Sequence, residues 1–493
     1  MSDQDLGFSV HWNRALKSLF KEFAPAAITS LLGEPVHIES LSVSDLSLPA
    51  CARFCQQYLK MKPGDMAIVN DPSSGGSSLD EICLVRAISL GGKSETDFLL
   101  SIRFSMGGTG DPKSAIHSLR IPPTPIAVRD HLNKEILMAV GSHPGASIHF
   151  EEELSKHIDK LRTLELRLLR LRQLPGLSFS NDQLESYFDS TKKSLLSWIS
   201  KNLSNGEFQF QHRLSTGELI KLRIECKENE NILFDFIGTT SSENFQLTEY
   251  MSFAACFAAL VSFSNFEIPA NQGSFSALQL RTPQNSMLNV KQIKNTFLAT
   301  RMNLKELCDF LRMSLLKLTP SGKNFARDSE GIGPCSLSFG PKAIWDFHLH
   351  GGQGGSHEHD GAPLFSSWTH DVFANSFSVE EIEKRFALQF ENISKHSHIL
   401  GKGIYKGGAG IQMNFRILAE AELDLHSGPF NERAVGQSGG KSGEKSEASF
   451  EVGREKTEIS ANLKQKLQPQ TLLRFSSGGG GGWGEEKVEE DED

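Results

Sequence analysis

The sequence has no apolar run long enough to cross a membrane as a helix. Its most apolar run covers residues 250–263, YMSFAACFAALVSF, whereas a transmembrane helix needs about 20 residues. We therefore expect a buried helix there and no membrane partner. The chain also lacks the basic start and apolar stretch of an export signal, because it opens with the acidic segment MSDQD.

Cysteine is scarce, with seven residues scattered along 493. An odd and dispersed set does not form a disulfide framework, so we expect the reducing cytoplasm as the location. Cys51 and Cys55 are four residues apart on an expected helix and so share one of its faces. No histidine or second cysteine pair lies near them, and we interpret them as core thiols rather than as a metal or redox site.

An excess of positive charge is also missing. The formal net charge is −9 and the basic residues form no cluster, which argues against a nucleic-acid partner. The chain is 38% hydrophobic and 23% charged, the balance of a globular protein rather than of a disordered one. A chain of this length is expected to hold about three domains.

Hydrophobic periodicity predicts a mixture of helices and strands. The expected helices cover residues 8–32, 47–60, 149–173, 183–202, 246–263, 303–318 and 378–387. Extended segments are expected at 36–42, 66–69, 82–90 and 97–105, and a hairpin over 207–238 with its turn at 227–231. Strands and helices do not alternate regularly, so we predict an α+β fold of several layers with antiparallel sheets.

Composition divides the chain into four expected regions. Residues 1–145 form an N-terminal α+β region, and residues 146–330 a helical and mixed middle region. Residues 331–477 form a glycine-rich β region, and residues 478–493 a glycine-rich, acidic tail that we expect to be disordered.

The loop that runs from Asn70 to Glu81, NDPSSGGSSLDE, is the first candidate site. Its carboxylates, Asp71, Asp80 and Glu81, lie on both sides of the Gly75-Gly76 pair. The backbone amides of such a turn can meet an anion or a metal-bound oxygen. The alternative is that Asp-Pro and Gly-Gly simply build turns.

A histidine-rich segment is the second candidate site. His348 and His350 form one pair, and His357 and His359 form another. Residues two apart on a strand point to one face, so the two pairs could converge on a transition metal. The alternative is a solvated, glycine-rich loop, because the spacing matches no zinc pattern closely.

Glycine recurs at Gly401, Gly403, Gly407, Gly408 and Gly410, and again over residues 478–482. No Gly-Lys-Ser/Thr directly follows these glycines, and no long helix opens after them, so a nucleotide-binding loop is not expected. We interpret these glycines as tight turns between strands.

Several short motifs, in this order, resemble the hydantoinase B/oxoprolinase family. The matching stretches are Lys62-Pro63-Gly64-Asp65, Asn70-Asp71-Pro72 with Gly75-Gly76, Leu119-Arg120-Ile121-Pro122-Pro123, the helix after Asn133, Ile268-Pro269 with Asn271 and Gly273, Ser286 with Leu288-Asn289, the glycines from Gly401 to Gly410, and residues 478–484. Together they span residues 35–485, and their shared order argues against a chance match.

This resemblance implies a cytoplasmic B-type subunit that works with an ATP-binding A-type subunit. The family includes B-type subunits of N-methylhydantoinases, the C-terminal half of 5-oxoprolinase, and subunits of acetone and acetophenone carboxylases. The implied substrate is a small cyclic amide, with ATP bound by the partner and not by this chain. That division agrees with the missing nucleotide loop.

The sequence departs from the family where the family carries its metal ligands. The family's Thr-His-Leu-Pro-Asp loop is here Ser77 to Glu81, with Ser78 in place of the histidine. The family's His-His-Ala-Asp-like group is here Phe104 to Gly108, which contains no ligand. We therefore expect the usual divalent metal centre to be lost, since a hydroxyl replaces imidazole poorly.

Two metal sites stay open as hypotheses. Asp71, Asp80 and Glu81 would supply oxygen ligands to a harder ion. The four histidines, His348, His350, His357 and His359, would form a relocated site.

The leading hypothesis is a B-type subunit of an ATP-dependent cyclic-amide hydrolase. The expected catalytic residues are Asp71, Asp80 and Glu81, and the expected substrate-binding residues are Gly75, Gly76 and Ser78. One alternative is a catalytically degenerate scaffold or regulator of the ATP-binding subunit. The other is a subunit of an ATP-dependent ketone carboxylase.

Overall fold

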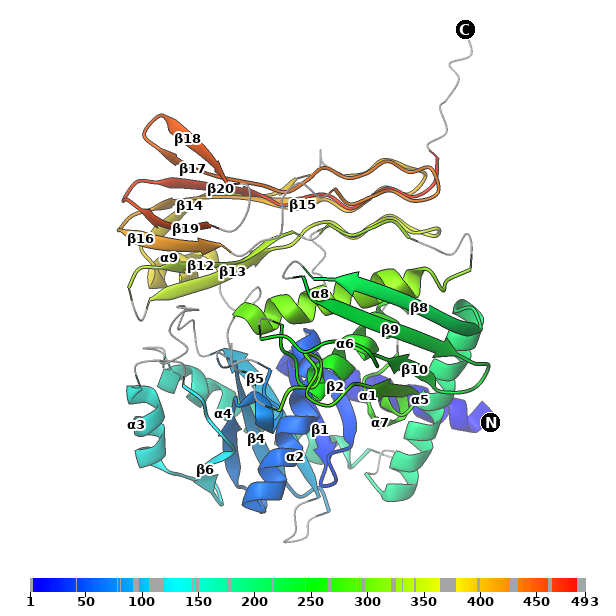
Figure 1. The fold of residues 1–493 in the computed structure, drawn as a ribbon. Helices are drawn as coiled ribbons and strands as arrows, with labels where there is room; N and C mark the ends of the chain where they lie inside the picture. The colour runs from blue at the N-terminus through cyan, green and yellow to red at the C-terminus, as the bar shows by residue number, and fades with distance from the viewer. Residues whose placement is uncertain are drawn as a thin grey trace. The chain divides into compact units, whose positions relative to one another are not determined.

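The chain divides into two compact units, Met1–Leu318 and Thr319–Asp493, which are coloured from blue to green and from green to red in Figure 1. The computed structural model describes residues 3–40, 42–77, 79, 81–91, 97–105, 119–143, 146, 150–174, 179–214, 217–243, 245–264, 268–291, 293, 298–320, 325–329, 331–340, 343–363, 378–396, 400–425, 433–459 and 463–485. Both units consist of helices and of sheets that are antiparallel except at one pair, β10 with β11, which confirms the predicted α+β class.

A seven-stranded antiparallel sheet forms the centre of the first unit (Figure 1), in the order β2-β1-β5-β4-β3-β6-β7. Its strands are β1 (Ala26–Ser30), β2 (Pro35–Glu39), β3 (Met66–Val69), β4 (Glu81–Ile88), β5 (Phe98–Ser105), β6 (Thr124–Val128) and β7 (His131–Leu132). Every residue of β3 and β4 is buried. Such strands need apolar residues on both faces, which explains their continuous hydrophobic runs.

Helices pack on both faces of this sheet. They are α1 (Asp3–Phe20), α2 (Leu48–Leu59), α3 (Lys134–Ser142), α4 (Phe150–Leu171) and α5 (Asn181–Asn202). The leucines of α4 share a hydrophobic core with Ile82 and Leu84 of β4, whereas α2 places Cys51 beside Cys83. Because strand side chains alternate, α4 and α2 cover opposite faces.

The strong helical patterns are confirmed, with one correction near the N-terminus. In α4 the leucines Leu154, Leu161, Leu164 and Leu168 are buried, and Leu171, which has the same spacing, is half-buried. The first helix, predicted over residues 8–32, instead ends at Phe20, and residues 26–30 form β1. Proline at position 25 has no amide hydrogen for a helix, and the β-branched residues that follow favour a strand.

A second, four-stranded sheet follows in the order β11-β10-β9-β8. Its strands are β8 (Gly206–Arg213), β9 (Leu219–Cys226), β10 (Ile232–Asp235) and β11 (Leu278–Arg281), and the accompanying helices are α6 (Glu249–Ser262), α7 (Gln272–Phe275) and α8 (Leu298–Leu316). The predicted turn at 227–231 joins β9 to β10. The prediction of a single hairpin over 207–238 was wrong, because a further turn divides the segment before it into two strands, β8 and β9.

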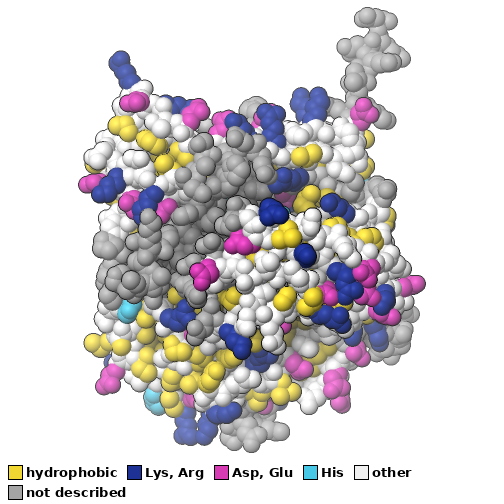
Figure 2. Space-filling view, viewed as in Figure 1, with side chains coloured by type: hydrophobic (Ala, Val, Ile, Leu, Met, Phe, Trp, Pro, Cys, Tyr) yellow, Lys and Arg dark blue, Asp and Glu magenta, His cyan; other side chains and the backbone are white. Residues whose placement is uncertain are grey.

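Helix α6 is buried, as its apolar sequence predicts, and it packs against α8. None of the helices described is both long enough and apolar enough to cross a membrane. Acidic and basic side chains are interspersed over strands β8 to β10, as Figure 2 shows. Arg223, for example, pairs with both Glu207 and Asp235.

The second unit holds two antiparallel sheets that pack through aromatic side chains. One has the order β13-β12-β16-β19 and the other β14-β15-β20-β17-β18. The elements are β12 (Ile332–Ser338), β13 (Ile344–Leu349), α9 (Val379–Arg385), β14 (Leu388–His396), β15 (Gly410–Ile417), β16 (Ala421–Leu425), β17 (Glu447–Val452), β18 (Glu455–Ile459), β19 (Leu463–Leu467) and β20 (Leu472–Ser476). Trp345 of the first sheet lies 5.4 Å from Phe415 of the second, measured between ring centroids.

Glycine-rich segments of this unit pack backbone against backbone. The amide of Gly408 donates to the carbonyl of Gln353 at 2.7 Å, and the amide of Gly480 donates to the carbonyl of Gly408 at 3.0 Å. A Cβ on Gly352 would lie 1.8 Å from the Gly408 oxygen, and one on Gly480 would lie 1.9 Å from the Gln353 oxygen. Only glycine therefore fits at these contacts.

Two predictions are corrected by this packing. The glycines from Gly401 to Gly410 are not tight turns, because the backbone there runs alongside other backbone segments. Residues 478–482 are buried rather than disordered. The end of the predicted tail, residues 486–493, lies outside the described residues.

Replacing Gly408 with alanine should destabilise the second unit by about 3 kcal/mol or more. The new Cβ would lie 1.9 Å from the main-chain oxygen of Ala362, which cannot rotate away. Gly453→Asn is the control, because Gly453 has a φ of +65° and no atom within 4 Å of an added Cβ. The midpoint of urea unfolding measures both variants, and equal midpoints would contradict the packing described here.

Candidate functional site

The side chain of Asn70 joins the candidate loop to the rest of the protein through hydrogen bonds. Its Nδ2 donates to the carbonyl of Leu79 at 2.7 Å and to that of Leu119 at 2.8 Å. Its Oδ1 accepts from the amide of Ile121 at 2.6 Å. One buried side chain thus joins the start of the loop, its end and the 119–121 segment, so the described part of the loop is held firmly.

Asp71 takes part in turn chemistry. Its Oδ1 accepts from the amide of Ser73 at 3.0 Å and from the Ser73 hydroxyl at 2.6 Å, which caps the short 3₁₀ helix η3 (Pro72–Ser74). Arg120 lies 3.5 Å away as an ion-pair partner. These contacts are those of the alternative interpretation, in which Asp-Pro builds the turn. A catalytic role for Asp71 stays a prediction.

Gly75 and Gly76 approach the protein's own backbone closely. Gly75 has a φ of +88°, and a Cβ there would lie 2.5 Å from the amide nitrogen of Cys51, in the first turns of α2. A Cβ on Gly76 would lie 2.1 Å from the oxygen of Asn70. Both glycines are therefore required by the fold, and their contact with a substrate stays a prediction.

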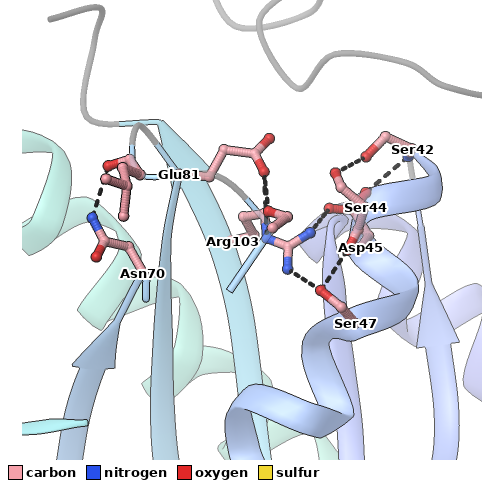
Figure 3. Close-up of polar contacts among 9 residues, drawn as sticks. Ser42, Ser44, Asp45, Ser47, Asn70, Glu81 and Arg103 are labelled. Carbon is pink, nitrogen blue, oxygen red and sulfur yellow. Dashed lines mark hydrogen bonds and ion pairs between the residues drawn. The ribbon is translucent and has the colours of Figure 1, made fainter. Parts of the chain in front are cut away.

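Glu81 is the predicted catalytic residue with the most distinctive surroundings. It is the first residue of β4 and is 3% exposed. Its Oε2 accepts from the hydroxyl of Ser77. The same oxygen lies 3.9 Å from the Nε of Arg103 (Figure 3). A buried carboxylate between a hydroxyl and a guanidinium is a suitable group for proton transfer or for charge stabilisation.

Arg103 connects Glu81 to a second carboxylate behind it. The guanidinium, on β5, is 1% exposed. Its Nη1 donates to Oδ1 of Asp45 at 3.2 Å, and its Nη2 donates to the Ser47 hydroxyl at 2.8 Å (Figure 3). Burial opposes the charge of Arg103, but the charges of Glu81 and Asp45 outweigh it and raise the Arg103 pKa.

Two thiols complete the surroundings of Arg103. Cys83 lies directly opposite Arg103 in the pairing of β4 with β5, and its thiol hydrogen-bonds that of Cys51. The hydrogen bond with Cys83, assisted by the positive charge of Arg103, lowers the pKa of Cys51. Burial raises the pKa of Cys83. All seven cysteines are buried, and none of them forms a disulfide.

The surroundings of Glu81 do not favour a metal ion. Within the described ranges, no three His, Cys, Asp or Glu side chains are grouped to hold one. An ion bound to Glu81 would also be repelled by the guanidinium of Arg103, 3.9 Å from its carboxylate. The residues described here therefore do not fit the metal centre that the family resemblance implies.

The structure brings the four histidines together only in part. The rings of His348 and His350 lie 5.2 Å apart between centroids. His357 lies 3.3 Å from the carboxylate of Glu358, and the Nδ1 of His359 lies 2.9 Å from the carbonyl of Asp360. A metal site formed by all four stays a prediction.

Asp80 and Ser78 lie outside the described residues, so their predicted roles stay predictions. Sequence reasoning missed Arg103, Asp45 and Ser47. A signal for Arg103 was present, because an arginine inside the apolar run FLLSIRFS must be paired if that strand is buried. Nothing comparable marked Asp45, whose partner is 58 positions away in the chain.

Comparison with known proteins agrees with this fold. The family model of hydantoinase B/oxoprolinase matches residues 32–486, and the chain belongs to that family. It is 24% identical over 447 residues to 5-oxoprolinase of Saccharomyces cerevisiae, a match that covers 83% of this chain and 34% of that one. The chain thus spans about a third of the length of that relative.

A relative of more similar length is an uncharacterised protein of Methanocaldococcus jannaschii. It is 22% identical, and the match covers 91% of this chain and 81% of that one.

Two solved structures share the fold. The ATP-dependent caprolactamase of Pseudomonas jessenii has a TM-score of 0.78 at 17% identity, with 97% of this chain and 90% of that chain covered. Nucleotide-free acetone carboxylase has a TM-score of 0.74 at 10% identity, with 96% and 73% covered. At these identities the likeness concerns the fold alone.

A buried histidine behind the site gives the protein a pH-dependent stability. His157 of α4 stacks on Phe104, the residue after Arg103, with ring centroids 4.4 Å apart. Burial lowers the pKa of His157 to about 4. Below pH 6.5 the unfolded chain protonates this histidine and the folded chain does not, so stability is lost as the pH falls from 6.5 to 4.

We expect the burial of neutral His157 to lower the free energy of unfolding by about 2 kcal/mol at pH 5. His157→Gln removes this titration, so the stability gap between wild type and variant should narrow by about that amount between pH 7 and pH 5. Urea unfolding at the two pH values measures the gap. His131→Gln, at an exposed position, is the control. The account would be contradicted if wild type and His157→Gln differed in free energy of unfolding by the same amount at both pH values.

Proposed function

We propose that this chain is the hydantoinase B component of an ATP-dependent enzyme that opens a small cyclic amide. Membership of the family over residues 32–486 supports this. The names of two similar proteins, a 5-oxoprolinase and a caprolactamase, support a lactam as substrate. The observation that carries the proposal is the buried carboxylate of Glu81, hydrogen-bonded by Ser77 and beside Arg103.

ATP would be bound outside this chain. A lactam carbonyl is a poor electrophile, and transfer of a phosphoryl group to its enol oxygen gives the ring carbon a leaving group. The sequence holds no Gly-x4-Gly-Lys-Ser/Thr phosphate loop. Its two Gly-Lys-Ser tripeptides, at 92–94 and 440–442, have Ala87 and Val435 where that loop has its first glycine. An ATP-binding A-type subunit would therefore activate the substrate. The present chain would then direct the attack of water on the activated carbon, with Glu81 accepting the proton of that water.

A second candidate is a scaffold for the ATP-binding subunit without catalysis of its own. The contacts of Asp71 and Glu81 favour it, because both carboxylates are engaged by the protein itself. A ketone carboxylase subunit is the third. This function would be identified if ATP-dependent turnover required bicarbonate and a ketone instead of a lactam.

Glu81→Gln should lower turnover of the complex at least about 100-fold while leaving the protein folded. Glutamine keeps the shape of the side chain and can still accept from Ser77, but it cannot take up a proton. The measurement is lactam-dependent ATP hydrolysis with the ring-opened amino acid followed by mass spectrometry. The control is Glu165→Gln, which likewise removes the partner of a buried arginine, since Glu165 binds Arg86 at 2.8 Å.

If both Glu81→Gln and Glu165→Gln lost activity, general destabilisation would explain the loss in Glu81→Gln. Full activity in Glu81→Gln would exclude Glu81 from the reaction and favour the scaffold.

Metal content tests the histidine hypothesis separately. Because the structure does not group the four histidines, we expect no equivalent of a transition metal that depends on them. Elemental analysis of the chain purified with its partner measures this. The relocated site would be established instead if the chain held one equivalent of a transition metal and lost it on replacement of all four histidines by alanine. These are His348, His350, His357 and His359.

A further inference from the structure

The side chains of Glu81 and Arg103 lie on one face of the central sheet. Glu81 pairs with Ser105, and Cys83 pairs with Arg103, so Arg103 is the diagonal neighbour of Glu81 across β4 and β5. Diagonal neighbours are within reach of long side chains. The register of two buried strands thus determines where the guanidinium stands relative to the carboxylate.

Two residues of one short helix hold the guanidinium from behind. The 3₁₀ helix η2 (Val43–Ser47) presents Asp45 and Ser47, which accept from Nη1 and Nη2 of Arg103. Asp45 is fully buried, and its other oxygen accepts from the amide of Ser42 at 2.8 Å. Helix α6 packs against η2. The rear anchors are therefore themselves fixed within the core.

The two carboxylates on Arg103 are held differently. Asp45 makes a hydrogen bond of 3.2 Å to the end of the guanidinium fork, whereas Glu81 lies 3.9 Å from its Nε. The longer contact is not the short bidentate pair that would hold a carboxylate in one position. A group that has to exchange a proton benefits from this arrangement.

Arg86, in the same sheet, has the contacts expected of an arginine with a structural function. It lies on β4 and is 5% exposed, and it also joins two carboxylates. Both of its contacts are short, at 2.7 Å to Asp130 and 2.8 Å to Glu165. Arg86 therefore provides an internal control for the general effect of changing a buried arginine.

We propose that Arg103 is a positioning residue for Glu81, and that Asp45 and Ser47 position Arg103 in turn. This inference rests on the proposed function, in which Glu81 exchanges a proton. Asp45 competes with Glu81 for the single positive charge. Removing the charge of Asp45 therefore strengthens the hold of Arg103 on Glu81, and removing the charge of Arg103 leaves Glu81 beside a second anion.

Opposite shifts of the pH profile test this competition. In the assembled enzyme, Asp45→Asn should move the acidic limb of the kcat profile to lower pH, and Arg103→Gln should move it to higher pH. Both should lower kcat between about 10-fold and 100-fold with little change in KM. Ser47→Ala, a milder change, should lower kcat less. Arg86→Lys should leave the profile in place.

Hydrogen exchange separates failure of this inference from failure of the proposed function. In the whole chain, Arg103→Lys should speed exchange of the amides over residues 73–77, because Arg103 lies beside the carboxylate that Ser77 binds. Arg86→Lys should not, because Arg86 pairs with Asp130 and Glu165 instead. If wild-type complex turns over no lactam, the proposed function is lost, and this exchange difference alone decides the inference. Variants of Asp45 and Arg103 that behave like Arg86→Lys in both measurements would overturn it.

Discussion

A buried guanidinium organises the N-terminal unit around the candidate site. Taking a charge out of water costs several kcal/mol unless opposite charge and hydrogen bonds replace the solvent. Arg103 is 1% exposed, so Asp45 and Glu81 stabilise the fold by remaining beside it. Two strands, one short helix and the end of the candidate loop are thereby held in one arrangement. The position of Glu81 is a consequence of burying Arg103.

The second unit depends on a different constraint, the exclusion of side chains. Gly352, Gly408 and Gly480 let three backbone segments approach within the space that a Cβ would occupy. Hydrogen bonds between the segments satisfy amides and carbonyls that would otherwise be buried without partners. The dense glycine of the C-terminal sequence is thus a packing requirement.

Local patterns predicted the regular elements well, and long-range contacts limited the rest. The leucine stripe of α4 and the apolar runs of β3, β4 and β5 carry their periodicity within a few residues. The glycine segments and the Arg103–Asp45 pair depend on partners far away in sequence. For the same reason the sequence singled out the loop from Asn70 to Glu81 as a candidate site but not the residues behind it. The proposed reaction class came from family motifs, because no local pattern contains it.

The central claim is that Glu81, held by Arg103, lies at the place where a cyclic amide reacts. A structure of the chain with its ATP-binding partner and a bound lactam tests this most directly. The account predicts the lactam carbonyl carbon beside the carboxylate of Glu81, with room for one water between them. A lactam bound away from Glu81, with the Arg103 cluster unchanged, would contradict the account and leave this cluster as a structural element only.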